Sequence, residues 1–327
     1  MKHLELDLPQ ADPVAAAEVQ SRVDQVLRPL GALGRLDEIA VWLAGWQRTS
    51  LPDVDPVHCI VFAGDHGVVG AGVSAYPSGV TDSMLGALRA GVATANAMCN
   101  TLGVHLSVVD VGVGRPTGDI TREPAMSQER FDEAWKAGRD AVSDLGSPGL
   151  LVLGEMGIGN TTAAAAVCAG VFDGDARAWT GRGTGIDDKG FERKVAAVEA
   201  AARRIRGLPP LEILRRGGGA ELVAIAGAVV EARLHSIPVV LDGFVVGAAC
   251  APIEAAVPGI LQHTIAGHCS AEPGHRLLLE KLGMQPILDL GLRLGEGSGA
   301  LAAVPLIRVA AHAVTDVATF EEWGLGR

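Results

Sequence analysis

The stretch from Gly149 to Gly170 constrains the fold of this chain most strongly. A short apolar run, Leu150–Leu153, leads into the loop Gly154–Thr162 and then into the alanine-rich run Ala163–Ala169. This order predicts a strand, a glycine loop and a helix. Glycines let the backbone approach a ligand, and small polar residues favour a helix start whose N–H groups point into the loop. We therefore expect an anion at this loop.

Such turns also occur in α/β proteins that bind nothing there, and the loop alone leaves this alternative open. Glu155 argues for chemistry at the loop. An acid inside a phosphate loop repels the phosphate unless it serves the sugar or the reaction. We therefore expect Glu155 to act beside a bound phosphate.

Four further apolar runs end in polar loops, and helical periodicity lies between them. These runs are Val57–Ala63, Val104–Val111, Ile237–Leu241 and Ile260–Ala266. The alternation predicts an α/β fold with a doubly wound, Rossmann-like parallel sheet, whose strands all end at one rim. Between them we expect one helix over Met84–Leu102 and another over Val245–Ala251 that ends at Pro252.

The two ends of the chain carry helical spacing and are expected to form a smaller unit. We predict an amino-terminal helical segment at residues 1–50, a large α/β nucleotide-binding domain at 51–299, and a carboxyl-terminal helix at 300–327 that packs with the first segment.

Charge and composition exclude several classes of protein. A net charge of −11 disfavours nucleic acid as a partner, because such binding requires clustered lysine and arginine. Apolar runs such as Val239–Ala251 are broken by Asp and Gly, so no membrane span is expected. Met1–Pro13 lacks the apolar core of a signal peptide, and the five cysteines show no paired spacing. These features predict a cytoplasmic protein with reduced thiols.

A metal site is the less favoured interpretation of the histidines. His263, His268, Cys269 and His275 lie within thirteen residues, yet His263 and His268 are an odd number of residues apart at a strand end and should face apart. We expect no metal and no cofactor, and a zinc-dependent hydrolase stays as an alternative from another class.

The loops at the predicted rim supply candidates for binding and catalysis. Residues 157–162 and 181–185 could enclose one phosphate with backbone N–H groups, with Lys194 or Arg182 as the countercharge. Asp242 could accept hydrogen bonds from ribose hydroxyls or cap the helix before Phe244. Glu296 stands among apolar and glycine neighbours, where desolvation would make it a general base near neutral pH; an acid favoured by a helix dipole is the alternative.

Eight motifs in this order resemble the nicotinate-nucleotide:5,6-dimethylbenzimidazole phosphoribosyltransferase family, which makes the lower-ligand nucleotide of cobalamin. They are Arg28–Leu36, Gly64–Val68, Val73–Thr81, Gly154–Thr162, Gly181–Gly185, Leu241–Phe244, Gly267–His275 and Leu292–Gly299. The resemblance implies a large parallel α/β domain, a small domain from both chain ends, and a homodimer. It also implies transfer of 5-phosphoribosyl from nicotinate mononucleotide to the benzimidazole base, with release of nicotinate.

The resemblance assigns roles to particular residues. Glu296 becomes the general base, and the loop that starts at Glu155 becomes part of the nucleotide site. The chemistry of such a transfer separately makes Glu155 a second catalytic carboxylate, which could stabilise an oxocarbenium-like transition state. The expected nucleotide-binding residues are Gly157, Ile158, Gly159, Asn160, Thr161, Gly181, Arg182, Gly183, Thr184, Gly185, Lys194, Asp242 and Ser270, and the expected base-binding residues are Ser74, Tyr76, Pro77 and Leu294. One departure concerns the base: Thr81 is followed by Asp82–Met84, where family members commonly carry a glutamine. Transfer to another base or a phenol, and a nucleotide-binding module without catalysis, stay as alternatives.

Overall fold

The computed structural model describes residues 7–326; residues 1–6 and residue 327, which belong to the predicted terminal segments, lie outside the described residues. Within this range five strands form one parallel sheet in the order β2-β1-β3-β4-β5. They are β1 (Val57–Ala63), β2 (His105–Asp110), β3 (Leu150–Met156), β4 (Val239–Leu241) and β5 (Thr264–Ala266). The predicted α/β class and the parallel sheet are confirmed.

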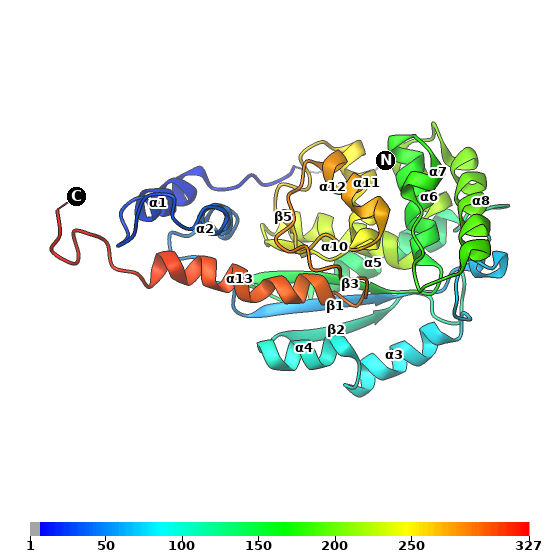
Figure 1. Ribbon diagram of the computed structural model, residues 1–327, viewed down its shortest axis with the longest axis horizontal. Helices are drawn as coiled ribbons and strands as arrows, with labels where there is room; N and C mark the ends of the chain where they lie inside the picture. The colour runs from blue at the N-terminus through cyan, green and yellow to red at the C-terminus, as the bar shows by residue number, and fades with distance from the viewer. Residues whose placement is uncertain (1–6, 327) are drawn as a thin grey trace.

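Helices cover both faces of this sheet (Figure 1). They are α2 (Arg35–Gln47), α3 (Val80–Ala90), α4 (Thr94–Leu102), α5 (Gln128–Ser143), α6 (Asn160–Phe172), α7 (Ala176–Trp179), α8 (Asp188–Ile205), α9 (Pro210–Gly217), α10 (Ala220–Leu234), α11 (Phe244–Ala256), α12 (Pro273–Leu282) and α13 (Ser298–Thr315), with a short 3₁₀ turn at Gly67–Ala71. Neighbouring residues of β1 point to opposite faces. Ile60 and Phe62 belong to a core with α5, α6, α8, α10 and α11, whereas Cys59 and Val61 belong to a core with α2, α4 and α13. The sheet is therefore doubly wound.

The strand order reverses direction between β1 and β3. From β1 the chain crosses to β2 on one side, and β3, β4 and β5 follow on the other side. Loops after strands on the two sides of such a switch point diverge and leave a crevice at the carboxyl ends of the strands. The loops that follow β1 and β3 flank this crevice, which positions the Gly154–Thr162 motif at the expected rim.

Two predicted helix boundaries were wrong. The helix predicted over Met84–Leu102 is two helices, because Gly91 adopts a left-handed conformation at φ 80° and ends α3. Helix α11 does not end at Pro252 but continues to Ala256. Proline removes one helical hydrogen bond. Here Pro252 and Ile253 are both buried in the core, and this burial stabilises the last turn.

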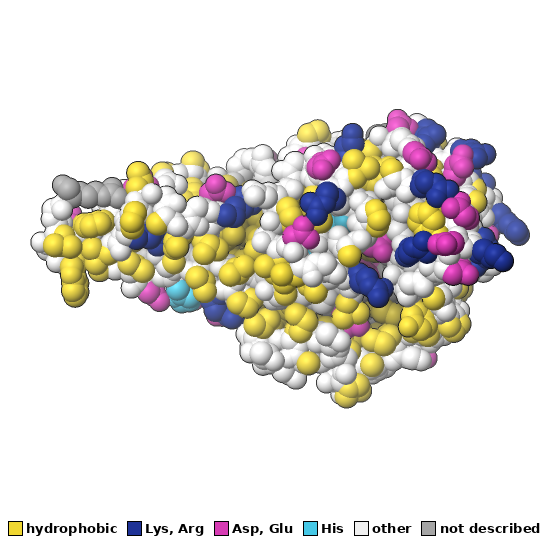
Figure 2. All heavy atoms as spheres, viewed as in Figure 1, with side chains coloured by type: hydrophobic (Ala, Val, Ile, Leu, Met, Phe, Trp, Pro, Cys, Tyr) yellow, Lys and Arg dark blue, Asp and Glu magenta, His cyan; other side chains and the backbone are white. Residues whose placement is uncertain are grey.

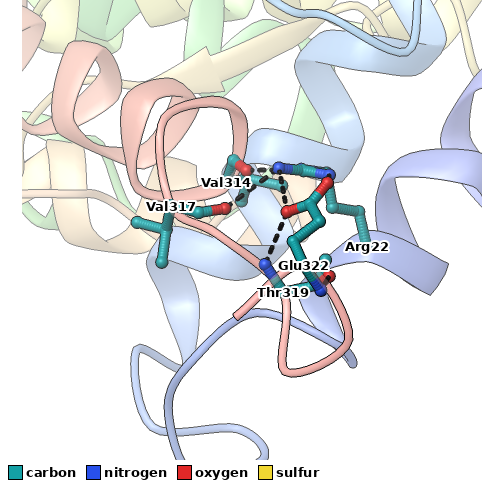
Figure 3. Close-up of polar contacts among 5 residues, drawn as sticks. All are labelled: Arg22, Val314, Val317, Thr319 and Glu322. Atoms are coloured by element: carbon teal, nitrogen blue, oxygen red, sulfur yellow. Dashed lines mark hydrogen bonds and ion pairs between the residues drawn. The ribbon is translucent and has the colours of Figure 1, made fainter. Parts of the chain in front are cut away.

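Helices from the two terminal segments of the chain pack together in an arm that extends from the sheet (Figure 1). Helix α1 (Pro13–Val23), α2 and the second half of α13 share a small apolar core of Val19, Val23, Ala40, Ala44 and Val314. Arg22 of α1 joins this core to the tail: its Nε donates to Val314 O at 2.9 Å, and its guanidinium pairs with Glu322 at 3.2 Å (Figure 3). The predicted domain boundary at 299/300 falls in the first turn of α13.

Helix α13 is the one helix among residues 7–326 that is long and apolar enough to cross a membrane, with a mean hydropathy of 1.4. However, 56% of it is buried inside the structure, where it packs against α2, α4 and β3. The core helix of a soluble protein passes the same test, so α13 is weak evidence for a membrane span.

Candidate active site

A cavity of about 730 Å³ opens at the carboxyl ends of the strands. Its walls come from the loop before α3 and the start of that helix, the loops after β3, β4 and β5, the loop at 181–185, helix α8 and the segment before α13. Both the expected phosphate loop and the expected general base line it. The crevice predicted from the strand order is therefore the candidate active site.

The loop after β3 requires its glycines for two different reasons. A Cβ at Gly157 would lie 2.7 Å from Gly64 O, so the backbone of the loop after β1 excludes a side chain there. Gly159 has a φ of 93°, a left-handed conformation that other residues rarely adopt. Ile158 N–H donates to Thr81 Oγ1 at 3.2 Å, and α6 begins at Asn160. The loop thus presents the N-terminus of α6 to the cavity, as an anion site requires.

Glu155 is buried at the cavity wall and is 8% exposed. Asn160 Nδ2 donates a hydrogen bond to Glu155 Oε2. Burial, with smaller contributions from Asp242 and Glu221, raises the Glu155 pKa to about 8. At neutral pH this carboxyl is therefore mainly protonated, and a cationic sugar beside it would favour the ionised form.

Glu296 stands next to Glu155 in a strained backbone conformation. Its φ is 65°, which is uncommon for a residue with a side chain, and its N–H donates to Glu155 O at 2.9 Å. The Glu296 carboxylate is 2% exposed and accepts one bond from Ala95 N–H at the start of α4, at 3.2 Å. Burial raises the Glu296 pKa, and the bond from Ala95 partly opposes this. A buried carboxylate with a raised pKa is suited to general base catalysis.

Asp242 caps a helix, but a different one from the helix considered in the sequence. Its Oδ1 accepts from Gly299 N–H at 2.8 Å and Ala300 N–H at 3.0 Å, at the start of α13. Burial raises the Asp242 pKa to about 7 in spite of these bonds. Asp242 also lines the cavity. Its bonds to Gly299 and Ala300 therefore hold the start of α13, and with it the preceding Glu296, at the cavity wall.

Lys194 is the buried cation of the site. It extends from α8, is 1% exposed, and its Nζ donates to Thr161 Oγ1 at 2.8 Å in the first turn of α6. Burial lowers the Lys194 pKa to about 8, and the nearby Glu272 opposes this shift. An ammonium group beside a helix N-terminus favours a phosphate at this position.

The cavity brings together most of the residues that the sequence singled out. Its lining includes Ser74, Tyr76, Glu155, Gly157, Ile158, Gly159, Asn160, Thr161, Gly183, Thr184, Lys194, Asp242, Ser270, Leu294 and Glu296. Pro77, Gly181, Arg182 and Gly185 are not among the lining residues. The Arg182 guanidinium instead donates to Ile186 O at 2.9 Å and pairs with Asp188, so Lys194 is the one of these two cations that lines the cavity.

Comparison with known proteins gives the family. A family model described as Phosphoribosyltransferase matches residues 8–325. A protein of Mesorhizobium japonicum, named nicotinate-nucleotide–dimethylbenzimidazole phosphoribosyltransferase, is 50% identical over 323 residues, which are 98% of this chain and 95% of the relative. The chain belongs to this family. The predicted resemblance is thereby confirmed, and the protein is an enzyme of the phosphoribosyltransferase class.

Other members of the family agree in sequence and structure. A relative with the same name from Novosphingobium aromaticivorans is 50% identical over 97% of this chain and 94% of its own length. A crystal structure of CobT from Thermus thermophilus superposes with a TM-score of 0.92 at 42% identity, and covers 96% of this chain and 100% of that one. The phosphoribosyltransferase fold therefore extends over nearly the whole chain.

Two charged lining residues of this phosphoribosyltransferase were missed in the sequence. Arg293 is a second cation, and its Nη1 donates to Gly183 O at 3.4 Å. Glu272 precedes α12 and accepts from Gly183 N–H at 2.9 Å. Both lie in motifs that carried the resemblance, but nothing in their local sequence shows that they meet the loop at 181–185.

The zinc alternative finds no support among the described residues. No group of three or more His, Cys, Asp or Glu side chains in residues 7–326 is arranged to hold a metal ion. His275 Nδ1 accepts from Ser270 N–H at 2.9 Å, so this ring supports the loop after β5.

Proposed function

We propose that this enzyme transfers the 5-phosphoribosyl group from nicotinate mononucleotide to 5,6-dimethylbenzimidazole, giving α-ribazole 5′-phosphate and nicotinate for the lower ligand of cobalamin. The observation that carries the proposal is one cavity with a buried ammonium at one wall and neighbouring buried carboxyls at another. The first wall suits a phosphate and the second suits a developing positive charge. The names of the relatives in Mesorhizobium japonicum and Novosphingobium aromaticivorans state the same two substrates.

In the proposed binding mode the phosphate is a handle that does not react. It lies at the N-terminus of α6 and is held there by the positive end of this helix and by Lys194, with Gly183 and Thr184 over it. Asp242 and Ser270 face the ribose. Because no phosphoryl group is transferred, the phosphate sites serve only to position C1 of the ribose.

The proposed reaction exchanges one base for another at C1. The bond from C1 to the pyridinium nitrogen breaks, and its electron pair goes to nicotinate, which leaves as a neutral ring without a proton donor. Glu155 stabilises the oxocarbenium-like charge on the sugar. The unprotonated nitrogen of the benzimidazole attacks C1 from the opposite face, and this attack inverts the anomeric carbon to α. Glu296 accepts the proton from the other nitrogen of the base.

The acceptor base is proposed to lie beside Ser74, Tyr76 and Leu294. Ser74 Oγ is 3.3 Å from Thr184 Oγ1, so this pocket adjoins the loop proposed for the phosphate. Met84 lines the same wall, in the segment that departs from the family pattern at Asp82–Met84. Another benzimidazole, a purine or a phenol is therefore the competing acceptor.

A panel of acceptors tests the proposal. The protein is incubated with nicotinate mononucleotide and, separately, with 5,6-dimethylbenzimidazole, unsubstituted benzimidazole, adenine or p-cresol, and nicotinate and ribosylated product are quantified by chromatography. We expect nicotinate and α-ribazole 5′-phosphate in equal amounts, fastest with 5,6-dimethylbenzimidazole. Faster transfer to another acceptor would overturn the assigned base, and nucleotide binding without nicotinate release would favour a module without catalysis.

We further propose a cytoplasmic homodimer in which residues 1–50 and 300–327 form a small domain beside residues 51–299. All five cysteines are free, which suits a reducing compartment. The arm exposes apolar side chains, each at least half exposed, at Val14, Leu30, Val309, Trp323 and Leu325. Figure 2 shows apolar atoms dominating the arm, whereas charged side chains gather at the α7 and α8 end. A mass of one chain by light scattering at micromolar concentration would contradict the dimer.

A further inference from the structure

Glu272 makes an unusual contact for a residue at a helix start. It occupies the N-cap position of α12, where Ser, Thr, Asp or Asn is preferred, and its side chain accepts no bond from that helix. Its Oε1 instead accepts from Gly183 N–H at 2.9 Å, across 89 positions of sequence. Its Oε2 is buried and has no hydrogen-bond partner among the described residues. The carboxylate therefore serves the loop at 181–185.

The loop lies between this carboxylate and the buried ammonium of Lys194. A Cβ at Gly181 would overlap Glu272 Oε2, so the loop backbone is in direct contact with the carboxylate. A Cβ at Gly183 would lie 3.0 Å from Lys194 Nζ and 3.0 Å from Thr161 Oγ1. Glu272 thus determines how closely the loop approaches Lys194 and the start of α6.

The negative charge of Glu272 needs a reason, because this wall of the cavity is otherwise suited to an anion. Glu272 faces the buried ammonium of Lys194. The hydrogen-bond partner of that ammonium, Thr161, is uncharged. The second cation at the loop, Arg293, donates to Gly183 O from the segment before α13. The charge of Glu272 partly offsets the effect of burial on the Lys194 pKa. Removal of this charge would therefore lower the Lys194 pKa further.

We infer that Glu272 is a positioning residue, which holds the loop at 181–185 over Lys194 so that loop and ammonium together receive the phosphate of the nucleotide. This inference rests on the proposed function. Glu272 does not touch the reacting atoms in this account. It acts through the Gly183 N–H, by its hydrogen bond, and through Lys194, by its charge. The two contributions can be separated by Glu272→Gln, because an amide oxygen still accepts the hydrogen bond from Gly183 but carries no negative charge.

The test compares Glu272→Ala and Glu272→Gln with the wild type, with Glu280→Gln as the control. Glu280 is an exposed acid on the same helix, so its replacement removes an equal charge away from the loop. The KM for nicotinate mononucleotide, the kcat and the pH profile of kcat/KM are measured for each protein. Titration calorimetry with nicotinate mononucleotide, without acceptor, measures binding independently of catalysis.

For Glu272→Ala we expect the KM and the dissociation constant for the nucleotide to rise about tenfold, with kcat within about threefold of the wild type. For Glu272→Gln we expect most of this binding to return, with the fall of kcat/KM at high pH shifted to lower pH. The control should match the wild type. Unchanged nucleotide binding in Glu272→Ala, or equal losses in both Glu272 variants without a shift of the pH profile, would overturn the inference. If the wild type binds the nucleotide but transfers nothing, the proposed function fails, while the calorimetry still decides the role of Glu272.

Discussion

The substitution Glu296→Gln tests the proposed general base with little change of shape. The amide has nearly the same size as the carboxylate. Its oxygen can still accept from Ala95 N–H, which donates to the Glu296 side chain at 3.2 Å. The backbone at φ 65° carries a residue with the same branching in both proteins. The variant therefore removes one property of the site: the ability of this position to accept a proton.

The expected loss follows from the size of general base catalysis. Proton transfer to a positioned base contributes on the order of 10²–10⁴-fold, or about 3–5 kcal/mol of activation free energy. We expect kcat for nicotinate release to fall by at least about 100-fold. The KM for nicotinate mononucleotide should stay within about twofold, because the proposed phosphate site at Lys194 is unchanged. The assay is steady-state chromatography of nicotinate with saturating acceptor.

The pH profile gives a second measure of the same residue. Glu296 must be ionised to accept a proton, so the wild-type kcat should fall as the pH drops through its pKa, which burial raises above the usual value for glutamate. In Glu296→Gln this acidic limb should disappear. Glu129→Gln, at an exposed position in the first turn of α5, is the matched control. A kcat within about threefold of the wild type in Glu296→Gln would refute the assignment.

Three further predictions concern binding, stability and packing. The kcat/KM for the nucleotide should fall as the pH rises through about 8, where Lys194 loses its proton. Lys194→Met should raise the KM for the nucleotide about 10- to 100-fold and abolish this fall of kcat/KM at high pH. An unchanged KM would remove Lys194 from the phosphate site. Gly138→Ala should lower the free energy of unfolding by about 3 kcal/mol, because its Cβ would overlap Ala224 O where α5 packs on α10. Gly86→Ala, with open space around the new Cβ, should raise the free energy of unfolding by about 1 kcal/mol. Urea denaturation measures both, and equal effects would contradict the packing of α5 on α10. Asp242→Ala should cost about 1–2 kcal/mol through the lost cap of α13, and no change in the urea midpoint would contradict the cap.

The central strands were predictable because their signal is local, whereas the run predicted as a strand over Ile260–Ala266 is a strand only over Thr264–Ala266. Runs such as Val57–Ala63 are apolar on both faces, as buried parallel strands must be, and this run agrees with β1 residue for residue. The glycine loop after β3 was predictable for the same reason, since its left-handed and crowded positions admit little but glycine. The break at Gly91 was not, because helical spacing continues across it and a single glycine is often tolerated within a helix.

The site residues likewise divide into those that the local sequence marks and those whose role depends on contacts with distant parts of the chain. Glu155 and Glu296 could be singled out because each is a charge among small or apolar neighbours in the sequence. Lys194 follows Glu192 and Arg193, and it was singled out by its place on the helix after the loop at 181–185 and by the family resemblance. The role of Glu272 depends on a contact across 89 positions, and the choice of Lys194 over Arg182 depends on the direction each side chain takes from its helix or loop. Asp242 likewise caps α13, more than fifty positions further on. Such contacts are set by tertiary packing, which local sequence does not encode.

A crystal structure with nicotinate mononucleotide and 5,6-dimethylbenzimidazole soaked into the Glu296→Gln variant would test the central claim most directly. We expect the phosphate within hydrogen-bond distance of Lys194 Nζ and of the N–H groups at the start of α6, with C1 of the ribose facing the base and the side chain at position 296 beside the distal base nitrogen. A nucleotide whose phosphate lies away from Lys194, or a base out of reach of position 296, would contradict the account.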